Sequence, residues 1–184
     1  MQLMDRGNLY KLALTYLGTA DYVPGSPEAR ALADVEQHVI ALATAYTPWR
    51  WAQRVATLTL TDGSTALPAD CLELRSCNLS QWELIGRTIT TPTTASKVQI
   101  TYTSTAWADT LTIPDHHPLF AEALALLLAA KAAVRITNSH QLAAQLEQQA
   151  NHALYRAKLA EVRAVHSNDQ QPQDWKDMLP WVTT

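Results

Sequence analysis

Hydrophobic residues recur at helical spacing in the first fifty positions. Leu9 begins a run in which apolar residues repeat every three or four positions until Gly18, a residue that suits a helix end. Ser26 followed by Pro27 is typical of a helix start, with serine as the cap and proline in the first turn. The apolar repeat that follows stops before Pro48. The pattern predicts two helices, over about 5–18 and 27–47.

The carboxyl half of the chain predicts two more helices. The first, over about 117–137, has almost no polar face and should be covered on most sides. Asp115 can cap its start. Asn138 and Ser139 then offer a break and a new cap, after which a long amphipathic helix is predicted over about 139–166. We expect these two helices to fold back against each other.

One face of this last helix is rich in alanine. Five members recur every three or four residues and form a stripe: Leu142, Leu146, Ala150, Ala153 and Ala157. Small side chains let another helix approach closely, so we expect a helix to pack against this stripe. Three cations on the same helix are candidates for facing a polyanion, although a solvated helix face is the more common role of such charges: Arg156, Lys158 and Arg163.

Between the second and third helices the apolar period changes to two. Asp62-Gly63 is a strong signal for a two-residue hairpin, and Gly86-Arg87 suits a second one. A later run alternates valine, isoleucine and tyrosine with polar residues. The predicted fold is therefore mainly α: a bundle of about four helices with a small antiparallel sheet, over about 50–105, inserted into it.

Composition narrows the class of protein. The 184 residues are 47% hydrophobic and 17% charged, which is typical of a soluble globular domain. A net charge of −3 gives no reason to expect a nucleic-acid surface, and two cysteines imply no disulfide framework. The first residues do not resemble a signal peptide, and no apolar run is long enough to cross a membrane.

No catalytic or cofactor motif stands out. The five glycines are isolated, so no phosphate-binding loop is predicted. Asp115, His116 and His117 are adjacent, but sequence neighbours rarely point at one metal ion, and we favour their use at a helix start. Cys71 and Cys77 lack a second pair and are expected to be small buried hydrophobes. We therefore expect neither a metal nor a cofactor.

Two pairs of side chains remain as candidates for a binding or catalytic role. Asp70 and Glu73 have the chemistry that a glycosidase requires, but almost any chain of this size offers such a pair. Trp49 and Trp51 follow the second helix directly and precede the region of period two. We expect them to fill the junction between bundle and sheet, with ligand stacking as the less favoured interpretation.

The segment 167–184 departs from the rest of the chain. Its first half is polar and cannot bury enough apolar surface to become ordered by itself. Trp175, Met178, Leu179 and Trp181 follow immediately. This combination predicts a carboxyl-terminal arm that is mobile in the free protein and becomes ordered when a partner covers its aromatic residues.

Several short motifs occur in a fixed order along residues 8 to 166. They are Leu17-Gly18 after a short helix, Pro48-Trp49-Arg50-Trp51-Ala52, Leu67-Pro68-Ala69-Asp70-Cys71, the strand that ends near Tyr102, and Pro118 with Phe120 before an alanine- and leucine-rich run. In this order the chain resembles the head-to-tail adaptor proteins of short-tailed bacteriophages, also called tail accessory or head completion proteins. Trp51 departs from the pattern, since phenylalanine is more usual there.

The resemblance implies a structural role without enzymatic activity. About twelve copies would form a ring beneath the portal protein, extend the DNA channel without sequence-specific binding, and carry tail nozzle, tube or fibre proteins. The arm with Trp175, Met178, Leu179 and Trp181 would bind the portal. The stripe of Leu142, Leu146, Ala150, Ala153 and Ala157 would pack between subunits, and the candidates for facing the channel would be Arg156, Lys158 and Arg163. The protein would be made in the host cytoplasm and reside in the neck of the virion, with no membrane partner.

Two other functions stay open at this point. A phage tail protein of this kind could hydrolyse peptidoglycan, and an assay on murein with variants of Asp70 and Glu73 would reveal it. Alternatively, the chain could be an unrelated bacterial helical adaptor whose arm binds a host protein. Portal and terminase genes next to its own gene would favour the phage interpretation.

Overall fold

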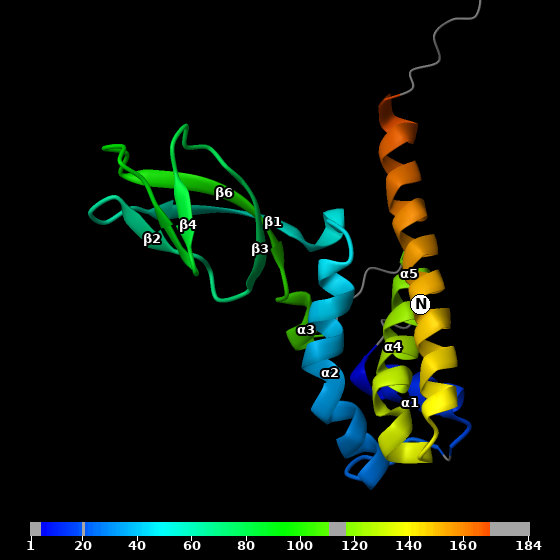
Figure 1. Cartoon of the computed structure of the whole chain (residues 1–184). Helices are drawn as coiled ribbons and strands as arrows, with labels where there is room; N and C mark the ends of the chain where they lie inside the picture. Colours follow the sequence, from blue (N-terminus) through cyan, green and yellow to red (C-terminus); the bar gives the residue numbers. More distant parts are fainter. Residues whose placement is uncertain (1–4, 20, 111–116, 170–184) are drawn as a thin grey trace, which may run out of the picture.

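The computed structural model describes residues 5–19, 21–110 and 117–169. Four main helices pack together, and two small antiparallel sheets project from them (Figure 1). The elements in chain order are α1 (Arg6–Leu17), α2 (Pro27–Ala45), η1 (Arg50–Ala52), β1 (Gln53–Thr59), β2 (Ser64–Ala66), β3 (Cys71–Cys77), β4 (Glu83–Ile85), β5 (Thr88–Thr90), β6 (Lys97–Ser104), α3 (Trp107–Thr110), α4 (Pro118–Thr137) and α5 (His140–Asp169). The mainly helical class predicted from the sequence is confirmed.

Local capping sets most helix ends. Gly18 ends α1 with a left-handed backbone (φ 67°), and Asn138 ends α4 in the same way (φ 54°). The hydroxyl of Ser26 accepts a hydrogen bond of 3.1 Å from the N–H of Ala29 at the start of α2. These caps confirm the predicted ends to within a few residues, except that α5 continues three residues beyond 166.

The start of α5 is capped as predicted, whereas the start of α4 differs. The Ser139 hydroxyl accepts a hydrogen bond of 3.2 Å from the N–H of Leu142. The N-cap position of α4 is occupied by His117, with Pro118 in the first turn. The predicted cap, Asp115, lies outside the described residues.

Helix α4 forms the centre of the bundle and packs against α1, α2 and α5. Its side chains are buried on nearly all sides, as its uninterrupted apolar sequence predicts, and Phe120, Leu124 and Leu128 are fully buried. Burying one leucine contributes about 1.5–3 kcal/mol relative to leaving it exposed. The surrounding helices are therefore held largely by their contact with α4.

The inserted region consists of two three-stranded antiparallel sheets, in the orders β1-β6-β3 and β2-β5-β4, and not of one sheet. Val98, Ile100 and Tyr102 of the central strand β6 point inward and are buried. Both sheets contribute to a second apolar core, separate from that of the helices, made of Leu60, Cys71, Ile89, Val98, Ile100 and Tyr102.

The two predicted turns both occur, with different consequences. Gly86, with φ 60°, starts the two-residue turn that joins β4 to β5, as expected. Asp62 and Gly63 both have positive φ, and a side chain at Gly63 would lie 2.5 Å from the carbonyl oxygen of Thr91. This turn does not join paired strands, however, because β1 pairs with β6 and β2 pairs with β5.

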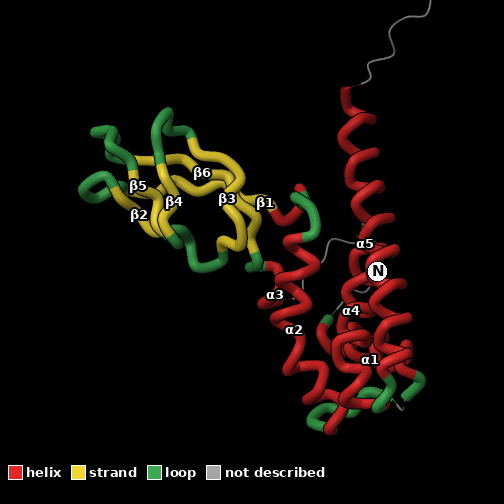
Figure 2. The backbone as a smooth tube through the Cα atoms, in the orientation of Figure 1, coloured by secondary structure: helices red, strands yellow, loops and turns green. Residues whose placement is uncertain are grey.

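The sheets lie on one side of the molecule and α5 lies on the other (Figures 1 and 2). The chain enters the sheet region through the short helix η1 and leaves it through α3, neither of which the sequence pattern predicts. The inserted region therefore projects from the bundle on two adjacent connections, as expected for an insertion between α2 and α4.

Candidate functional site

An aromatic cluster joins the helical bundle to the sheets. Trp49 precedes η1, Trp51 lies within it, Trp107 begins α3 and Phe120 lies in the first turn of α4. The ring centroids of Trp49 and Phe120 are 4.9 Å apart, and those of Trp51 and Trp107 are 5.3 Å apart. Trp49 is fully buried, and its indole N–H donates a 2.9 Å hydrogen bond to the carbonyl of Ala43. The predicted position of Trp49 and Trp51 at the junction is confirmed, and Trp107 joins them there.

Two members of this cluster are held by packing and not by hydrogen bonds. The indole N–H groups of Trp51 and Trp107 are buried and have no partner in the part of the chain that the structure describes. A buried donor without a partner costs about 1–3 kcal/mol. The ring contacts of these two tryptophans with Phe120 must therefore outweigh that cost. Packing of the aromatic rings is what holds the junction together.

Glu161 ties the far half of α5 to the same junction. One carboxylate oxygen accepts a 2.8 Å hydrogen bond from the backbone N–H of Arg50, and the other lies 3.4 Å from Nε2 of His117. The residue is buried, so the carboxylate would be costly without such partners. The contact connects α5, η1 and the start of α4.

The alanine-rich stripe of α5 packs within the chain. Leu146, Ala150, Ala153 and Ala157 are buried in the core that also contains α4, and Leu142 packs against its edge. The short turn between α4 and α5 makes the two helices antiparallel neighbours, so α4 covers the stripe first. The expectation that these five residues pack between subunits is corrected accordingly, because that face of α5 is already occupied.

The opposite face of α5 carries apolar residues that sequence reasoning missed. Tyr155 is 52% exposed and Leu159 is 39% exposed, one helical turn apart; we call this pair the α5 patch. Positions two residues apart on a helix differ by about 200°, which places Tyr155 opposite the buried Ala153 and Ala157. The signal was present as an i, i+4 apolar pair among polar residues, a spacing that indicates a contact surface.

Cations flank the α5 patch. Arg156 and Lys158 are exposed, and neither forms an ion pair with any described residue. They are also about 200° apart around the helix, so they lie on different sides of the patch and do not form one cationic face. Arg163 lies in α5, but its side chain is outside the described part. That these three residues face a DNA channel stays a prediction.

A second exposed apolar group lies on the sheets. Trp82, Leu84 and Ile85 are 40%, 41% and 60% exposed; we call them the β4 patch. Strand β4 stands at the edge of its sheet and is only three residues long. Two of these residues are in the edge strand and Trp82 directly precedes it, and exposed apolar residues at a sheet edge are typical of an interaction surface.

The candidate carboxylates of a hydrolase serve structural contacts. Asp70 accepts a hydrogen bond of 2.5 Å from the hydroxyl of Ser104 and one of 3.3 Å from the hydroxyl of Tyr102. Burial, and then the charge of Asp70, raise the pKa of Tyr102. Glu73 forms a two-pronged ion pair with Arg75, with one N···O distance of 2.9 Å. The contacts of Asp70 tie the turn before β3 to the end of β6.

The metal, cysteine and membrane predictions have the following outcome. Within residues 5–19, 21–110 and 117–169 there is no group of three potential ligands that could hold a metal ion, and His116 lies outside these ranges.

Cys71 is buried, which raises the pKa of its thiol, and Cys77 is half-buried. Both are free thiols that pack in the sheet core. In the same ranges, no helix has the length and apolar content needed to span a bilayer.

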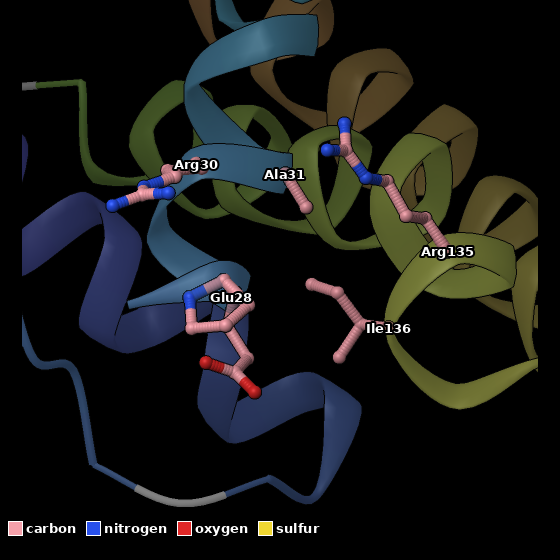
Figure 3. Close-up of a pocket in the computed structure, with 6 residues that line it drawn as sticks. Glu28, Arg30, Ala31, Arg135 and Ile136 are labelled. Atoms are coloured by element: carbon pink, nitrogen blue, oxygen red, sulfur yellow. The ribbon is translucent and has the colours of Figure 1, made fainter. Parts of the chain in front are cut away.

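A pocket of about 240 Å³ lies between the first turn of α2 and the last turn of α4 (Figure 3). It is lined by Pro27, Glu28, Arg30, Ala31, Arg135 and Ile136. Arg135 is engaged in an ion pair with Asp34 on α2. The pocket contains none of the carboxylates, cysteines or tryptophans that the sequence singled out, so it adds no catalytic candidate.

The predicted portal-binding residues, Trp175, Met178, Leu179 and Trp181, lie outside the described residues. A scan of the chain against protein-family models finds no match, and a search among curated proteins also finds none. The functional argument therefore rests on the residues themselves.

Proposed function

We propose that this chain is a structural protein of a phage virion: a head-to-tail adaptor that assembles as a ring beneath the portal. The ordered motifs between residues 8 and 166 support the proposal through their resemblance to such adaptors. Many of the motif residues lie at the joint between bundle and sheets, where Trp49, Trp51 and Phe120 pack together. Proteins that share this joint between bundle and sheets, but differ at their surfaces, would have such buried aromatic residues in common.

The observation that carries the proposal is the position of the two exposed apolar patches. Helix α5, which carries the α5 patch, lies on the side of the bundle away from the sheets, and the β4 patch belongs to the sheet region (Figure 1). Exposed apolar groups on a soluble protein commonly mark interaction surfaces. Two different patches on opposite sides suit head-to-tail contacts between copies, which close into a ring when the rotation permits.

The remaining partners follow from the proposed position in the virion. A ring of about twelve copies would leave a channel through which DNA passes without sequence-specific contacts, in keeping with the net charge of −3. The portal would bind on one side, through the arm, and tail nozzle, tube or fibre proteins on the other. The protein would be synthesised in the host cytoplasm and would reside in the virion neck. No enzymatic step, cofactor or membrane is part of this proposal.

The experiment compares the protein alone with the protein mixed with a portal preparation. Alone, light scattering should give a mass near 20.3 kDa, because the two patches are too small to hold a stable ring by themselves. With the portal, negative-stain class averages should show an added ring beneath it. A portal left undecorated at saturating protein would refute the adaptor function, and a stable ring in the absence of portal would refute the assembly order.

Of the two alternative functions, no observation favours hydrolysis, because Asp70 and Glu73 are engaged in contacts within the chain. Release of soluble fragments from murein, lost in variants of both residues, would reverse that judgement. Failure to decorate the portal would leave the unrelated helical adaptor as the remaining interpretation.

A further inference from the structure

We propose that the α5 patch of one copy docks on the outer face of the sheet β2-β5-β4 of the next copy. This inference rests on the proposed ring and names the contact that would build it. The occupant of the sheet face is thus a second copy of this chain, and the contact is heterologous: two different surfaces meet, and each copy uses both.

The pairing register defines which residues of the sheet face outward. Ile89 of the central strand β5 is fully buried, and Leu84 and Thr65 share its cross-strand row. Side chains alternate between the two faces of a sheet, so the neighbouring rows point the other way. The outer face therefore consists of the rows Glu83–Thr90–Ser64 and Ile85–Thr88–Ala66.

This outer face has an apolar part and an acidic end. Ile85 is its most exposed large side chain, at 60%, and lies beside Thr88 and Ala66. Glu83 lies in the other row, and the Asp62-Gly63 turn directly precedes Ser64 at the same end. Both carboxylates are exposed and form no ion pair with a described residue. Because Glu83 and Ser64 are two strands apart, the two acids are separated by about 10 Å.

The outer face of α5 is its counterpart in shape and charge. Tyr155 and Leu159 form a narrow apolar ridge. Arg156 and Lys158 lie on its two flanks, and a helix with its side chains is about 10–12 Å across. Two cations about 10 Å apart thus face two carboxylates about 10 Å apart, and Ile85 in the next row of the sheet supplies the apolar contact for the ridge. This match pairs four charges that have no ion-pair partner within the described chain.

The two surfaces cannot meet within one molecule. The sheets project on one side of α2, while α5 forms the opposite edge of the bundle (Figure 1). A contact between them must therefore join two copies and repeat from each copy to the next. The same contact gives Arg156 and Lys158 a protein partner, which takes them away from a channel wall.

One other exposed helical pair could compete for the sheet face. Leu42 and Tyr46 of α2 are 42% and 39% exposed and are also one turn apart. However, α2 carries no lysine or arginine after Arg30, so no counterpart of Arg156 or Lys158 lies beside Leu42. This pair is a matched control: its area is similar to that of the α5 patch, and the cations are missing.

The first test is photo-crosslinking of the full-length protein. Benzoylphenylalanine replaces Ile85 on the outer face of the sheet, and irradiation is carried out both at high protein concentration and on the portal-bound ring. The expected product is a covalent dimer in which position 85 is joined to the α5 segment that contains Tyr155. The same reagent in place of Tyr46 should give no crosslink to the sheets. Absence of the 85-to-α5 product under both conditions, or its replacement by a link to α2, would overturn the proposal.

The second test reverses charges that are exposed and unpaired, so that folding is preserved. Glu83→Lys alone, and Arg156→Glu with Lys158→Glu, should each reduce the crosslink yield at least about fivefold, since like charges then face each other. Combining all three substitutions in one chain should restore part of it, since Glu83→Lys then faces a glutamate while Asp62 still faces a like charge. Lys11→Glu, an exposed cation on α1, is the control and should change nothing. Loss without restoration would refute the charge match.

The outcomes separate this inference from the proposed function. A portal-bound ring whose crosslinks lie elsewhere would refute the contact and leave the adaptor function standing. The expected crosslinks without any decoration of the portal would support the contact and refute the adaptor function.

Discussion

The carboxylate of Glu161 accepts a hydrogen bond of 2.8 Å from the backbone N–H of Arg50, a residue 111 positions earlier in the chain. Its second oxygen lies 3.4 Å from Nε2 of His117. Through this one buried side chain, the distal half of α5 is connected both to the entry of the sheet region and to the start of α4. The direction in which α5 extends, and therefore the position of the α5 patch, depends on this contact.

Replacing Glu161 should measure the strength of that connection. Glu161→Ala leaves the N–H of Arg50 without its charged acceptor and should lower the free energy of unfolding by about 1.5–3 kcal/mol. Glu161→Gln keeps an oxygen acceptor of similar shape and should cost clearly less. Urea unfolding of both variants is the measurement. Equal losses in the two variants would show that the negative charge, which both variants lack, and not the hydrogen bond to Arg50, is the main contribution of the side chain.

Trp49→Ala should be among the most destabilising substitutions in the chain. The indole is fully buried, packs on Phe120 at 4.9 Å and is hydrogen-bonded to Ala43. Deleting a large buried aromatic costs about 3–5 kcal/mol. The matched control is Trp82→Ala at the exposed sheet edge, where a loss below about 1 kcal/mol is expected. A loss that small at Trp49, in urea unfolding, would contradict its place in the core.

Alkaline pH should weaken the packing of α1 on α2. Tyr10 donates a hydrogen bond of 2.6 Å to the buried carboxylate of Glu36, which also accepts one from Arg6. Burial, and then the hydrogen bond to Glu36, raise the pKa of Tyr10 above its usual value near 10. The unfolded chain therefore loses this proton at a lower pH than the folded chain does, so the contribution of Tyr10 to stability is fully present below about pH 10 and falls as the pH rises further.

The variant that isolates this effect is Tyr10→Phe. Its free energy of unfolding should be lower at pH 8, because one hydrogen bond to a charged group is lost, at about 1.5–3 kcal/mol. Between pH 8 and pH 11 its stability should fall less steeply than that of the unmodified protein. Some slope will remain, since the pKa values of Tyr16 and Tyr102 are also raised. Parallel pH profiles would show that Tyr10 titrates normally.

Helix boundaries were predictable because the signals that set them are local. Ser26 and Ser139 cap the starts of α2 and α5, each by accepting a hydrogen bond from the N–H of the residue three positions later. Gly18 and Asn138 adopt the left-handed conformation that ends a helix. The pairing of strands is not local. Asp62-Gly63 forms the expected turn, but the seven-residue strand β1 gains more by pairing along β6 than with the three residues of β2. The pattern of period two therefore located the strands and did not reveal that they divide into two sheets.

The candidate surface on α5 was predictable only in part, for a related reason. A periodic stripe of leucine and alanine identifies a face that will be buried, but not which helix buries it. The short turn before α5 assigns the stripe to α4. That assignment leaves the opposite face, with Tyr155 and Leu159, for contacts outside the chain. The buried Glu161 carries no sequence signal, because its partner Arg50 is recognisable only in three dimensions.

Deleting residues 170–184 should separate folding from assembly. The core residues of the bundle run from Leu9 to Ala157 and those of the sheets from Leu60 to Tyr102, so a chain that ends at Asp169 keeps all of them and should keep the thermal stability of the full protein. The same chain should fail to bind the portal, because Trp175, Met178, Leu179 and Trp181 supply the apolar area that a groove on the portal would bury. Thermal unfolding and portal pull-down are the two measurements.

The substitutions Trp175→Ala and Trp181→Ala in the full-length chain test whether the tryptophans themselves anchor the arm. Because a few large aromatic residues commonly contribute most of the binding energy of an interface, the double variant should reproduce most of the loss caused by the deletion. Twelve weak attachments add up in a ring, so the loss should be steeper for the assembled ring than for a single copy. The control exchanges polar residues of the same segment, Gln171→Ala with Gln173→Ala, and should bind as the unmodified protein does. If the chain that ends at Asp169 decorates the portal as well as the full chain, the anchor lies in the bundle, and the exposed surface of α2 with Leu42 and Tyr46 becomes the next surface to test.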